Sequence, residues 1–376
     1  MKQTLFFLFA ISSLFCTAQE NITSSFIYQD NFRDFKTYVP QAYLDNSNEA
    51  VPLLLNLHGY GSVNWQQEIY GDFRPIADAE NFIICHPNGT LDPDGSLYWN
   101  AGFESTIDDV GFLSALIDSL KILYNIDDEK VFSTGMSNGG FMSLTLACEL
   151  PNKVKAVASV TGSMTDFQIN NCTNTNPIPM MQIHGTNDQT VLYEGSGGVE
   201  GIENVVGFWV NHNSCDSLAL ETDVLDNDTG DNSTAIRYDF NQNCGDDASV
   251  VFYKVENGGH TWPGASFLIP GEVTNLDFDA SAVIWEFFCP ESTFTDINRI
   301  TNKQEVKVYP NPSNEHLQIS ISDSENLVSI QIYSETGKFV LEQTESHFNI
   351  SELSSGFYFL KIKTDAGIYT KKFVKE

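Results

Sequence analysis

The stretch that decides the fold reads Lys130-Val131-Phe132-Ser133-Thr134-Gly135-Met136-Ser137-Asn138-Gly139-Gly140. Its first five residues have the length and apolar content of a buried strand, and a helical pattern occupies 138–150. Between them lies G-x-S-x-G, whose glycines let the chain turn sharply and lift the serine hydroxyl above the sheet. This strand, turn and helix predict that Ser137 is a catalytic nucleophile.

The same alternation of strand and helix continues on both sides of this turn. Apolar runs typical of buried strands occupy 51–57, 82–85, 130–134, 154–160, 178–183 and 249–255. Helical patterns lie between several of them, notably at 108–123 and 138–150. These elements predict an α/β fold, a mostly parallel sheet covered by helices, in which reactive groups gather at the carboxyl ends of the strands.

A nucleophilic serine needs a base, and in an α/β-hydrolase the chain order is serine, then acid, then histidine. His260 fits this order among the seven histidines. It follows the last predicted strand of the body through Asn257-Gly258-Gly259, whose glycines let the loop turn an imidazole back over the sheet. His184 precedes the acid candidate and does not qualify. We therefore predict that His260 is the base.

The acid must lie between Ser137 and His260, at the end of a strand. Asp188 follows the predicted strand 178–183 and would hold the imidazole in the right tautomer. Asp166 also follows a strand and is the alternative, but it lies one crossover too early for the usual order. The predicted triad is Ser137, Asp188 and His260, which requires no metal and no organic cofactor.

Acyl transfer to a serine also needs donors for the developing oxyanion. The backbone N–H of Asn138, at the start of the helix after Ser137, is one predicted donor. The second should come from the loop His58-Gly59-Tyr60-Gly61-Ser62, where the backbone N–H of Tyr60 is the natural candidate. We interpret the His58 side chain as a structural hydrogen-bonding group.

With these residues in place, 26–290 resembles the polyhydroxybutyrate depolymerase and feruloyl esterase group of secreted α/β-hydrolases. Seven separated blocks carry the resemblance: 57–61, 86–89, 99–100, 108–113, 135–140, 184–188 and 258–264. The resemblance implies the same nucleophile, acid and base. Members of the group act on feruloyl or acetyl esters of plant polysaccharide, on short model esters or on hydroxyalkanoate polyesters.

Six cysteines remain once a leader that contains Cys16 is removed, and they allow 15 pairings. We favour Cys148 with Cys172 and Cys215 with Cys244, because each pair would close one local excursion between sheet elements, and the resemblance supports both. Cys85 is either a buried thiol or the partner of Cys289. No CxxC spacing occurs, so we predict no metal site.

The five tryptophans separate into two groups. Trp99 and Trp262 lie beside motif loops and are candidates to line a substrate pocket, with rim packing as the alternative. Trp65, Trp209 and Trp285 lie on helical patterns and are expected in the core.

Both ends of the chain indicate export. Residues 1–18 show a basic start at Lys2, a short apolar run and small residues before a cleavage point after Ala18, as in a signal peptide. We place the hydrolase domain at 19–290 and a polar linker at 291–303. Residues 304–376 alternate apolar and polar residues between turns, which predicts a small all-β sandwich.

This last segment resembles the C-terminal sorting domains of the bacterial type IX secretion system. The matching motifs are Tyr309-Pro310-Asn311-Pro312, Glu335-Thr336-Gly337-Lys338, Ser355-Gly356-Phe357-Tyr358 and Lys371-Lys372-Phe373-Val374-Lys375. The resemblance implies the type IX machinery as a partner, and a secreted or surface-attached protein. The alternative is an accessory substrate-binding module, which we disfavour because the segment contains no tryptophan.

Charge separates the same two parts. Residues 1–300 hold 11 basic and 40 acidic side chains, a net of −29, whereas 301–376 hold 8 and 10, a net of −2. So few cations argue against nucleic-acid binding, and no stretch after the leader is apolar enough for membrane insertion.

The sequence thus predicts a secreted serine carboxylic-ester hydrolase acting on feruloyl or acetyl esters borne by polysaccharide. The first alternative is a polyhydroxybutyrate depolymerase or oligomer hydrolase. The second is a non-catalytic surface adhesin on a hydrolase scaffold.

Overall fold

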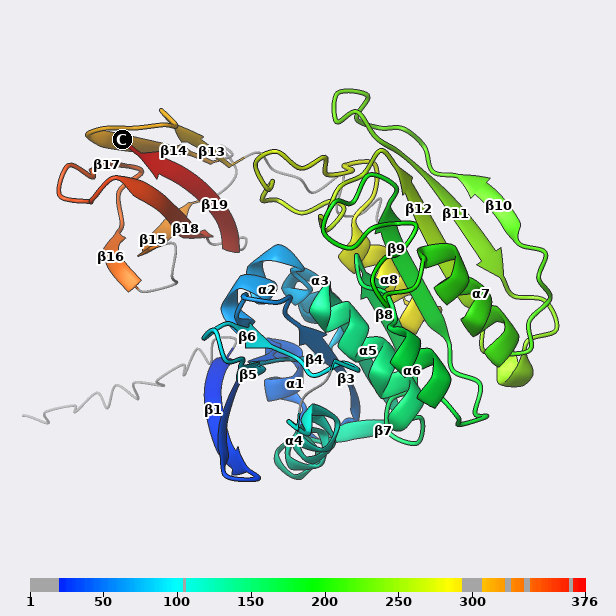
Figure 1. Cartoon of the computed structure of the whole chain (residues 1–376). Coiled ribbons are helices and arrows are strands. Elements are labelled where there is room, and N and C mark those ends of the chain that lie inside the picture. The colour runs from blue at the N-terminus through cyan, green and yellow to red at the C-terminus, as the bar shows by residue number, and fades with distance from the viewer. Residues whose placement is uncertain (1–19, 104–105, 293–305, 322–325, 335–338, 365–367) are drawn as a thin grey trace, which may run out of the picture.

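A twisted β-sheet flanked by helices forms the body of the protein in the computed structural model (Figure 1). The structure describes residues 20–103, 106–292, 306–321, 326–334, 339–364 and 368–376. The predicted signal segment 1–18 and residues 293–303 of the predicted linker lie outside the described residues.

Ten strands of the described residues form this sheet in the order β1-β2-β4-β3-β7-β8-β9-β12-β11-β10. The inner strands β4, β3, β7, β8, β9 and β12 run parallel, and the outer pairs at each edge run antiparallel. The bounds are β1 Glu20–Tyr28, β2 Asn31–Val39, β3 Val51–Leu57, β4 Ile83–Pro87, β7 Ile126–Met136, β8 Ala156–Val160, β9 Met180–Gly185, β10 Leu220–Asp223, β11 Thr234–Phe240 and β12 Val250–Glu256. A small hairpin, β5 Thr90–Leu91 with β6 Leu97–Tyr98, lies apart from the sheet.

Helices cover both faces of the sheet. Apolar residues of α4, α5 and α7 pack on one face, and those of α3 and α8 pack on the other. The helix bounds are α1 Gln41–Asp45, α2 Asn64–Tyr70, α3 Arg74–Glu80, α4 Asp109–Leu123, α5 Asn138–Glu149, α6 Asp166–Asn171, α7 Ile202–His212 and α8 Ala280–Phe288, with a 3₁₀ turn η1 at Gly245–Asp247. Among the described residues, no helix is long and apolar enough to cross a bilayer.

Each of the six predicted strands is present, and so are both predicted helices. The structure confirms the mostly parallel sheet with helices on its faces. The edge strands β1, β2, β10 and β11 were not predicted from the sequence. These strands carry polar residues, and all four residues of β10 are exposed, so they lack the continuous apolar run of a strand that is buried on both faces.

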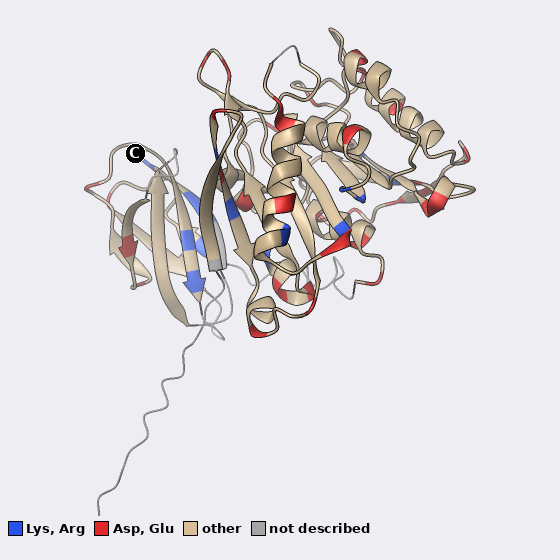
Figure 2. Cartoon of the chain, turned by 90° about the horizontal axis from the view of Figure 1, so that it is seen from below, with Lys and Arg blue, Asp and Glu red and all other residues tan. Residues whose placement is uncertain are grey.

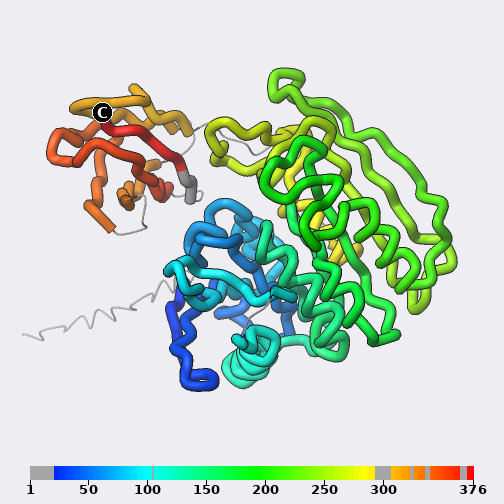
Figure 3. Tube along the Cα trace, viewed as in Figure 1, coloured from blue at the N-terminus to red at the C-terminus, as the bar shows by residue number. Residues whose placement is uncertain are grey.

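Residues 307–376 fold beside the body rather than within its sheet, as the trace in Figure 3 shows. They form two antiparallel sheets, of three and four strands in the described part, in the orders β13-β14-β17 and β16-β15-β18-β19. The bounds are β13 Lys307–Tyr309, β14 His316–Ser320, β15 Leu327–Ser334, β16 Phe339–Gln343, β17 His347–Asn349, β18 Gly356–Thr364 and β19 Ile368–Lys375. An apolar cluster of their own, including Leu317, Ile332 and Leu360, joins the two sheets. This confirms the predicted small all-β unit.

The two parts also differ in surface charge. Figure 2 shows acidic residues scattered over the helices and loops of the body, while basic residues mark the strands of the C-terminal part. This distribution matches the split of −29 and −2 in the sequence.

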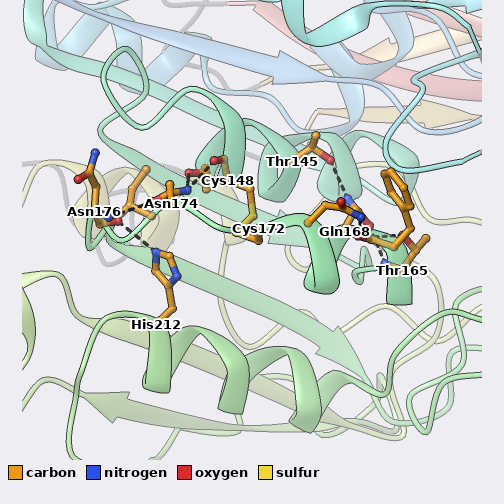
Figure 4. The surroundings of a disulfide bond; sticks show 12 residues. Thr145, Cys148, Thr165, Gln168, Cys172, Asn174, Asn176 and His212 are labelled. Atoms are coloured by element: carbon orange, nitrogen blue, oxygen red, sulfur yellow. Dashed lines mark hydrogen bonds between the residues drawn. A yellow bond between two sulfur atoms is a disulfide. The ribbon is translucent and has the colours of Figure 1, made fainter.

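Both preferred disulfides are present. Cys148, near the end of α5, is bonded to Cys172, which ends α6, and Cys215 is bonded to Cys244. Around the first bond, Gln168 Nε2 of α6 donates to Thr145 Oγ1 of α5 over 2.6 Å (Figure 4). Covalent and polar links therefore hold the short helix α6 against α5. Cys85 and Cys289 are free thiols, and Cys85 is buried.

Candidate active site

Ser137 lies in the sharp turn between β7 and α5. Its φ of +54° falls in the left-handed region that is rare for residues other than glycine, which marks a strained backbone. The N–H of Ser137 donates to the carbonyl of Val160 on the neighbouring strand β8 over 2.8 Å. The turn is therefore anchored to the sheet.

The glycines of the turn are required by close approach of the backbone. A Cβ at Gly135 would lie 2.5 Å from the carbonyl oxygen of Leu57, and one at Gly139 would lie 2.2 Å from the same atom. Real Cβ atoms do not come this close to backbone oxygens, so any side chain there would push α5 away from β3. The glycines fix the position of Ser137 relative to the loop after β3.

Asp188 and His260 meet at the carboxyl ends of β9 and β12. The distance from His260 Nδ1 to Asp188 Oδ2 is 2.7 Å, and the Asp188 side chain is fully buried. The other carboxylate oxygen, Oδ1, accepts the backbone N–H groups of Thr190 and Val191 over 2.8 and 2.9 Å. The carboxylate is thus oriented on both oxygens.

Electrostatics keep this carboxylate ionised. Burial alone would raise the pKa of Asp188, but hydrogen bonds from His184 and His260 outweigh it and hold the pKa well below its usual range. An ionised Asp188 can orient the His260 imidazole and stabilise its protonated form.

Ser137 and His260 reach the same cavity, whose volume is about 250 Å³. No hydrogen bond joins Ser137 Oγ to His260 among the described residues. Hydrogen bonds between nucleophile and base are often long in the absence of substrate, so shared access to the cavity is the relevant geometry.

The loop after β3 lies directly beside Ser137. A Cβ at Gly59 would be 3.4 Å from Ser137 Cβ, so this backbone is in contact with the serine. His58 holds the loop in place, because its Nε2 accepts the N–H of Gly89 over 3.0 Å and its Nδ1 donates to the carbonyl of Gly59 over 2.7 Å. Burial lowers the pKa of His58 to about 4, which keeps the ring neutral. Tyr60 of this loop lines the cavity.

The chain resembles known esterases over most of its length. Residues 100–198, which contain Ser137 and Asp188, match the model of the Phospholipase/Carboxylesterase family. The chain is 31% identical over 270 residues to a probable feruloyl esterase C of Aspergillus niger, covering 70% of this chain and 86% of that protein. The chain belongs to the feruloyl esterase family. It is a carboxylic ester hydrolase.

Other relatives of this esterase fall in the same group. Feruloyl esterase D of Neurospora crassa is 33% identical over 275 residues, covering 68% of this chain and 81% of that one. A bifunctional acetylxylan esterase/xylanase of Neocallimastix patriciarum is 28% identical over 230 residues, which are only 31% of that longer protein. Among solved structures, an acetyl xylan esterase from Aspergillus awamori aligns with a TM-score of 0.48 at 14% identity, covering 61% of this chain and 89% of that chain.

The C-terminal part of the esterase has its own match. Residues 307–376 match the secretion system C-terminal sorting domain, in agreement with the predicted type IX sorting function. The segment that carries these residues is thus an export module joined to a hydrolase.

Trp99 was predicted either to line a substrate pocket or to pack at its rim, and the described residues that line the cavity do not include it. Its side chain is fully buried. Its backbone N–H and carbonyl bind the side-chain amide of Asn138 over 2.6 and 2.9 Å, and its Nε1 donates to the carbonyl of His58 over 3.0 Å. Trp99 therefore ties the start of α5 to the loop after β3, the two places where the predicted oxyanion donors lie.

Trp262 is likewise not among the described residues that line the cavity. It is 1% exposed, and its ring packs against Phe73 while its Nε1 donates to Ser281. Its backbone N–H donates to the hydroxyl of Tyr70 over 3.2 Å. Because Trp262 follows His260 by two residues, this packing fixes the loop that carries His260.

The cavity is walled instead by aromatic residues that the sequence analysis did not single out for this role. Trp65, Tyr70 and Phe267 of the body line it, together with Phe359 of the C-terminal part. The rings contact one another, with centroids 5.5 Å apart for Trp65 and Phe359 and 6.1 Å apart for Tyr70 and Phe267. Trp65 is therefore a cavity residue and not a core residue, whereas Trp209 and Trp285 are buried as expected.

The esterase residues that the structure describes contain no cluster of three or more His, Cys, Asp or Glu side chains suited to hold a metal ion.

Proposed function

We propose that this esterase is a serine hydrolase in which Ser137, His260 and Asp188 form the catalytic triad. The observation that supports this best is the 2.7 Å contact between His260 Nδ1 and a fully buried Asp188, at the edge of a cavity that Ser137 also lines. The three residues come from the carboxyl ends of β7, β9 and β12, where α/β folds place their reactive groups.

In this mechanism His260 Nε2 takes the proton of Ser137 Oγ as the oxygen attacks the carbonyl carbon of the ester. The carbonyl oxygen becomes an oxyanion, which the backbone N–H groups of Tyr60 and Asn138 stabilise. Collapse of the intermediate expels the alcohol, which takes the proton from His260, and leaves an acyl group on Ser137. Water activated by His260 then releases the acid and restores the serine.

We propose feruloyl or acetyl esters on polysaccharide as the substrates. The named activities of the relatives, feruloyl esterase and acetylxylan esterase, support this class. The aromatic wall of Trp65, Tyr70 and Phe267 also suits a flat apolar acyl group, because aromatic rings stack and meet edge to face with favourable energy.

Hydrolysis of p-nitrophenyl acetate by the wild type and by Ser137→Ala tests the mechanism. We expect the variant to lose roughly 10⁴-fold or more in kcat, since residues of a triad act as a unit. Ser320→Ala, a strand residue of the C-terminal part, is the matched control and should keep full activity. Equal activity of wild type and Ser137→Ala would refute the serine mechanism.

Initial rates on methyl ferulate, acetylated xylan and hydroxybutyrate oligomers test the substrate class. A preference for the first or second compound supports the proposal. A clear preference for the oligomers would assign the enzyme to the hydroxyalkanoate branch of the group instead.

We also propose that export begins with a signal peptide at 1–18 and ends with the sorting domain at the surface or outside the cell. The match of 307–376 to a sorting domain supports this route. Mass analysis of the secreted protein should find Gln19 as the first residue and the loss of roughly 70–80 C-terminal residues, the size of a small domain. Retention of the leader would contradict the first assignment.

A further inference from the structure

His184 is a buried histidine beside the triad that the mechanism above does not use. It lies next to the end of β9, and its side chain is fully buried. Its Nε2 lies 3.3 Å from Asp188 Oδ2 and 2.9 Å from the carbonyl oxygen of Val191. Asp188 Oδ2 is the same oxygen that contacts His260. Two imidazoles therefore meet one carboxylate oxygen.

The hydrogen bonds around His184 fix its tautomer. The carbonyl of Val191 only accepts, so the ring nitrogen that contacts it, Nε2, must carry the hydrogen. On the other side of the ring, Gln182 Nε2 lies 3.3 Å from His184 Nδ1 and donates to the carbonyl of Gly162 over 2.9 Å. Because the Gly162 carbonyl can only accept, the Gln182 side chain must turn its amide nitrogen toward it. The same nitrogen faces His184 Nδ1, which therefore acts as the acceptor. The contacts of both ring nitrogens therefore place the single ring hydrogen on Nε2.

The alternation of β9 explains why these two side chains meet. Gln182 and His184 are two residues apart on a strand, so they point to the same face, together with Met180. The chain then turns at Gly185, whose carbonyl accepts the N–H of Asp188 over 3.3 Å. This turn brings the carboxylate back over the end of its own strand and onto the ring of His184.

Val191, in the loop that carries Asp188, is hydrogen-bonded through both its N–H and its carbonyl. Val191 donates its N–H to Asp188 Oδ1, and its carbonyl accepts from His184 Nε2. His184 therefore holds both the carboxylate and the loop that orients it. If the Nε2–H of His184 were removed, the Asp188 carboxylate would keep its contacts on Oδ1. It would lose the neighbour that sets the direction of Oδ2.

We propose that His184 is a positioning residue of the hydrolytic site, whose Nε2–H holds the Asp188 carboxylate and the Val191 carbonyl so that Oδ2 faces His260. This inference rests on the proposed triad. The N–H of His184 also partly neutralises the negative charge of the Asp188 carboxylate. A carboxylate without this donor would therefore stabilise a protonated His260 more strongly.

Two polar variants separate this role from simple packing. His184→Gln can place an amide N–H near the position of Nε2, whereas His184→Asn places its amide near Nδ1 and leaves Asp188 and Val191 without their donor. We expect His184→Asn to lose about tenfold in kcat and to shift the acid limb of kcat/KM upward by about half a pH unit or more. His184→Gln should stay within about threefold of the wild type, with the acid limb in its original place.

His86→Asn is the matched control. His86 is also a buried strand histidine, but its ring contacts Asn56 and not the triad. The His86→Asn variant should have a lower Tm but an unchanged acid limb of kcat/KM. The other titratable groups around the pair include Glu272, Tyr70, Tyr193, Glu203 and Lys254, and they are the same in all variants. Burial raises the pKa of Tyr70 and Tyr193, so neither titrates in the acid limb.

The downfield NMR signal of the proton between His260 and Asp188 gives a readout that does not depend on turnover. We expect His184→Asn to move or broaden this signal and His184→Gln to preserve it. Wild-type kinetics, acid limb and proton signal in His184→Asn would overturn the positioning role while the triad stands. A wild type that hydrolyses no ester would instead overturn the proposed function.

Discussion

The body and the C-terminal part both bury an apolar core between β-sheets, but they treat polar residues differently. In the C-terminal part the residues of β18 alternate regularly, with Tyr358, Leu360 and Ile362 facing the core. The body buries many more polar and charged side chains, among them His58, Asp188 and His184. Burying such groups costs free energy unless each is hydrogen-bonded. His58, His184 and Asp188 lie at or just after the carboxyl ends of β3 and β9, where α/β folds place their reactive groups.

Substitution of Asp188 should reveal the largest functional difference between the two parts. Replacing it by Asn keeps the size of the side chain but removes the charge that selects the tautomer of His260, so we expect kcat to fall by roughly 10³–10⁴-fold. Steady-state kinetics on p-nitrophenyl acetate measure the loss. The same exchange at Glu352→Gln in the C-terminal part, an exposed carboxylate, should leave kcat unchanged. A loss of less than tenfold in Asp188→Asn would assign the acid to another residue.

Removal of a disulfide should change the stability of the body but not that of the C-terminal part. All seven cysteines precede residue 290, so only the body can respond to their removal. Joint replacement of Cys148 and Cys172 by Ala should lower the free energy of unfolding of the body by about 2–4 kcal/mol. Calorimetry with separate transitions for the two parts measures this. A shift of the C-terminal transition instead would show that the two parts unfold together.

The pH dependence of stability gives a smaller effect with a defined sign. The pKa of Asp188 is lower in the folded state than its usual value, so its ionised form stabilises the fold above about pH 5, and this contribution shrinks as pH falls below about 4. We expect the stability difference between wild type and Asp188→Asn to narrow by roughly 1 kcal/mol between pH 7 and pH 3. Denaturant unfolding at both pH values tests it, and a difference that widens at low pH would reverse the sign.

Removal of the C-terminal part should have the smallest effect. All the proposed catalytic groups come from the body, and among the described residues that line the cavity Phe359 alone comes from residues 307–376. We therefore expect a chain that ends at residue 303 to keep kcat/KM for p-nitrophenyl acetate within about threefold. A loss of more than tenfold would mean that the C-terminal part completes the site.

Sequence alone predicted the elements whose position follows from chain order. Gly135 and Gly139 flank Ser137 in a recognisable turn, and the proposed acid and base follow from the order of strand ends. The contact of His184 with Asp188 was not predictable, because it depends on how tightly the chain turns after Gly185. The local disulfides were predictable since each closes a short excursion.

The role of Trp65 was missed because α2 is inverted relative to an ordinary amphipathic helix. Its polar residues Gln67 and Glu68 are buried, and Glu68 binds Arg74 over 3.1 Å and also pairs with Lys36. Trp65 and Ile69 line the cavity, next to Gln66 and Gln67 of the same helix. A helix pattern alone does not reveal which face meets a substrate cavity instead of the core.

Covalent labelling tests the central claim most directly. An aryl alkylphosphonate ester should react once with the wild type, and peptide mass analysis should place the adduct on Ser137, with no adduct on Ser137→Ala. The adduct should form far more slowly in His260→Ala, because the serine then lacks its base. An adduct on another residue, or continued ester hydrolysis after complete labelling of Ser137, would contradict the account.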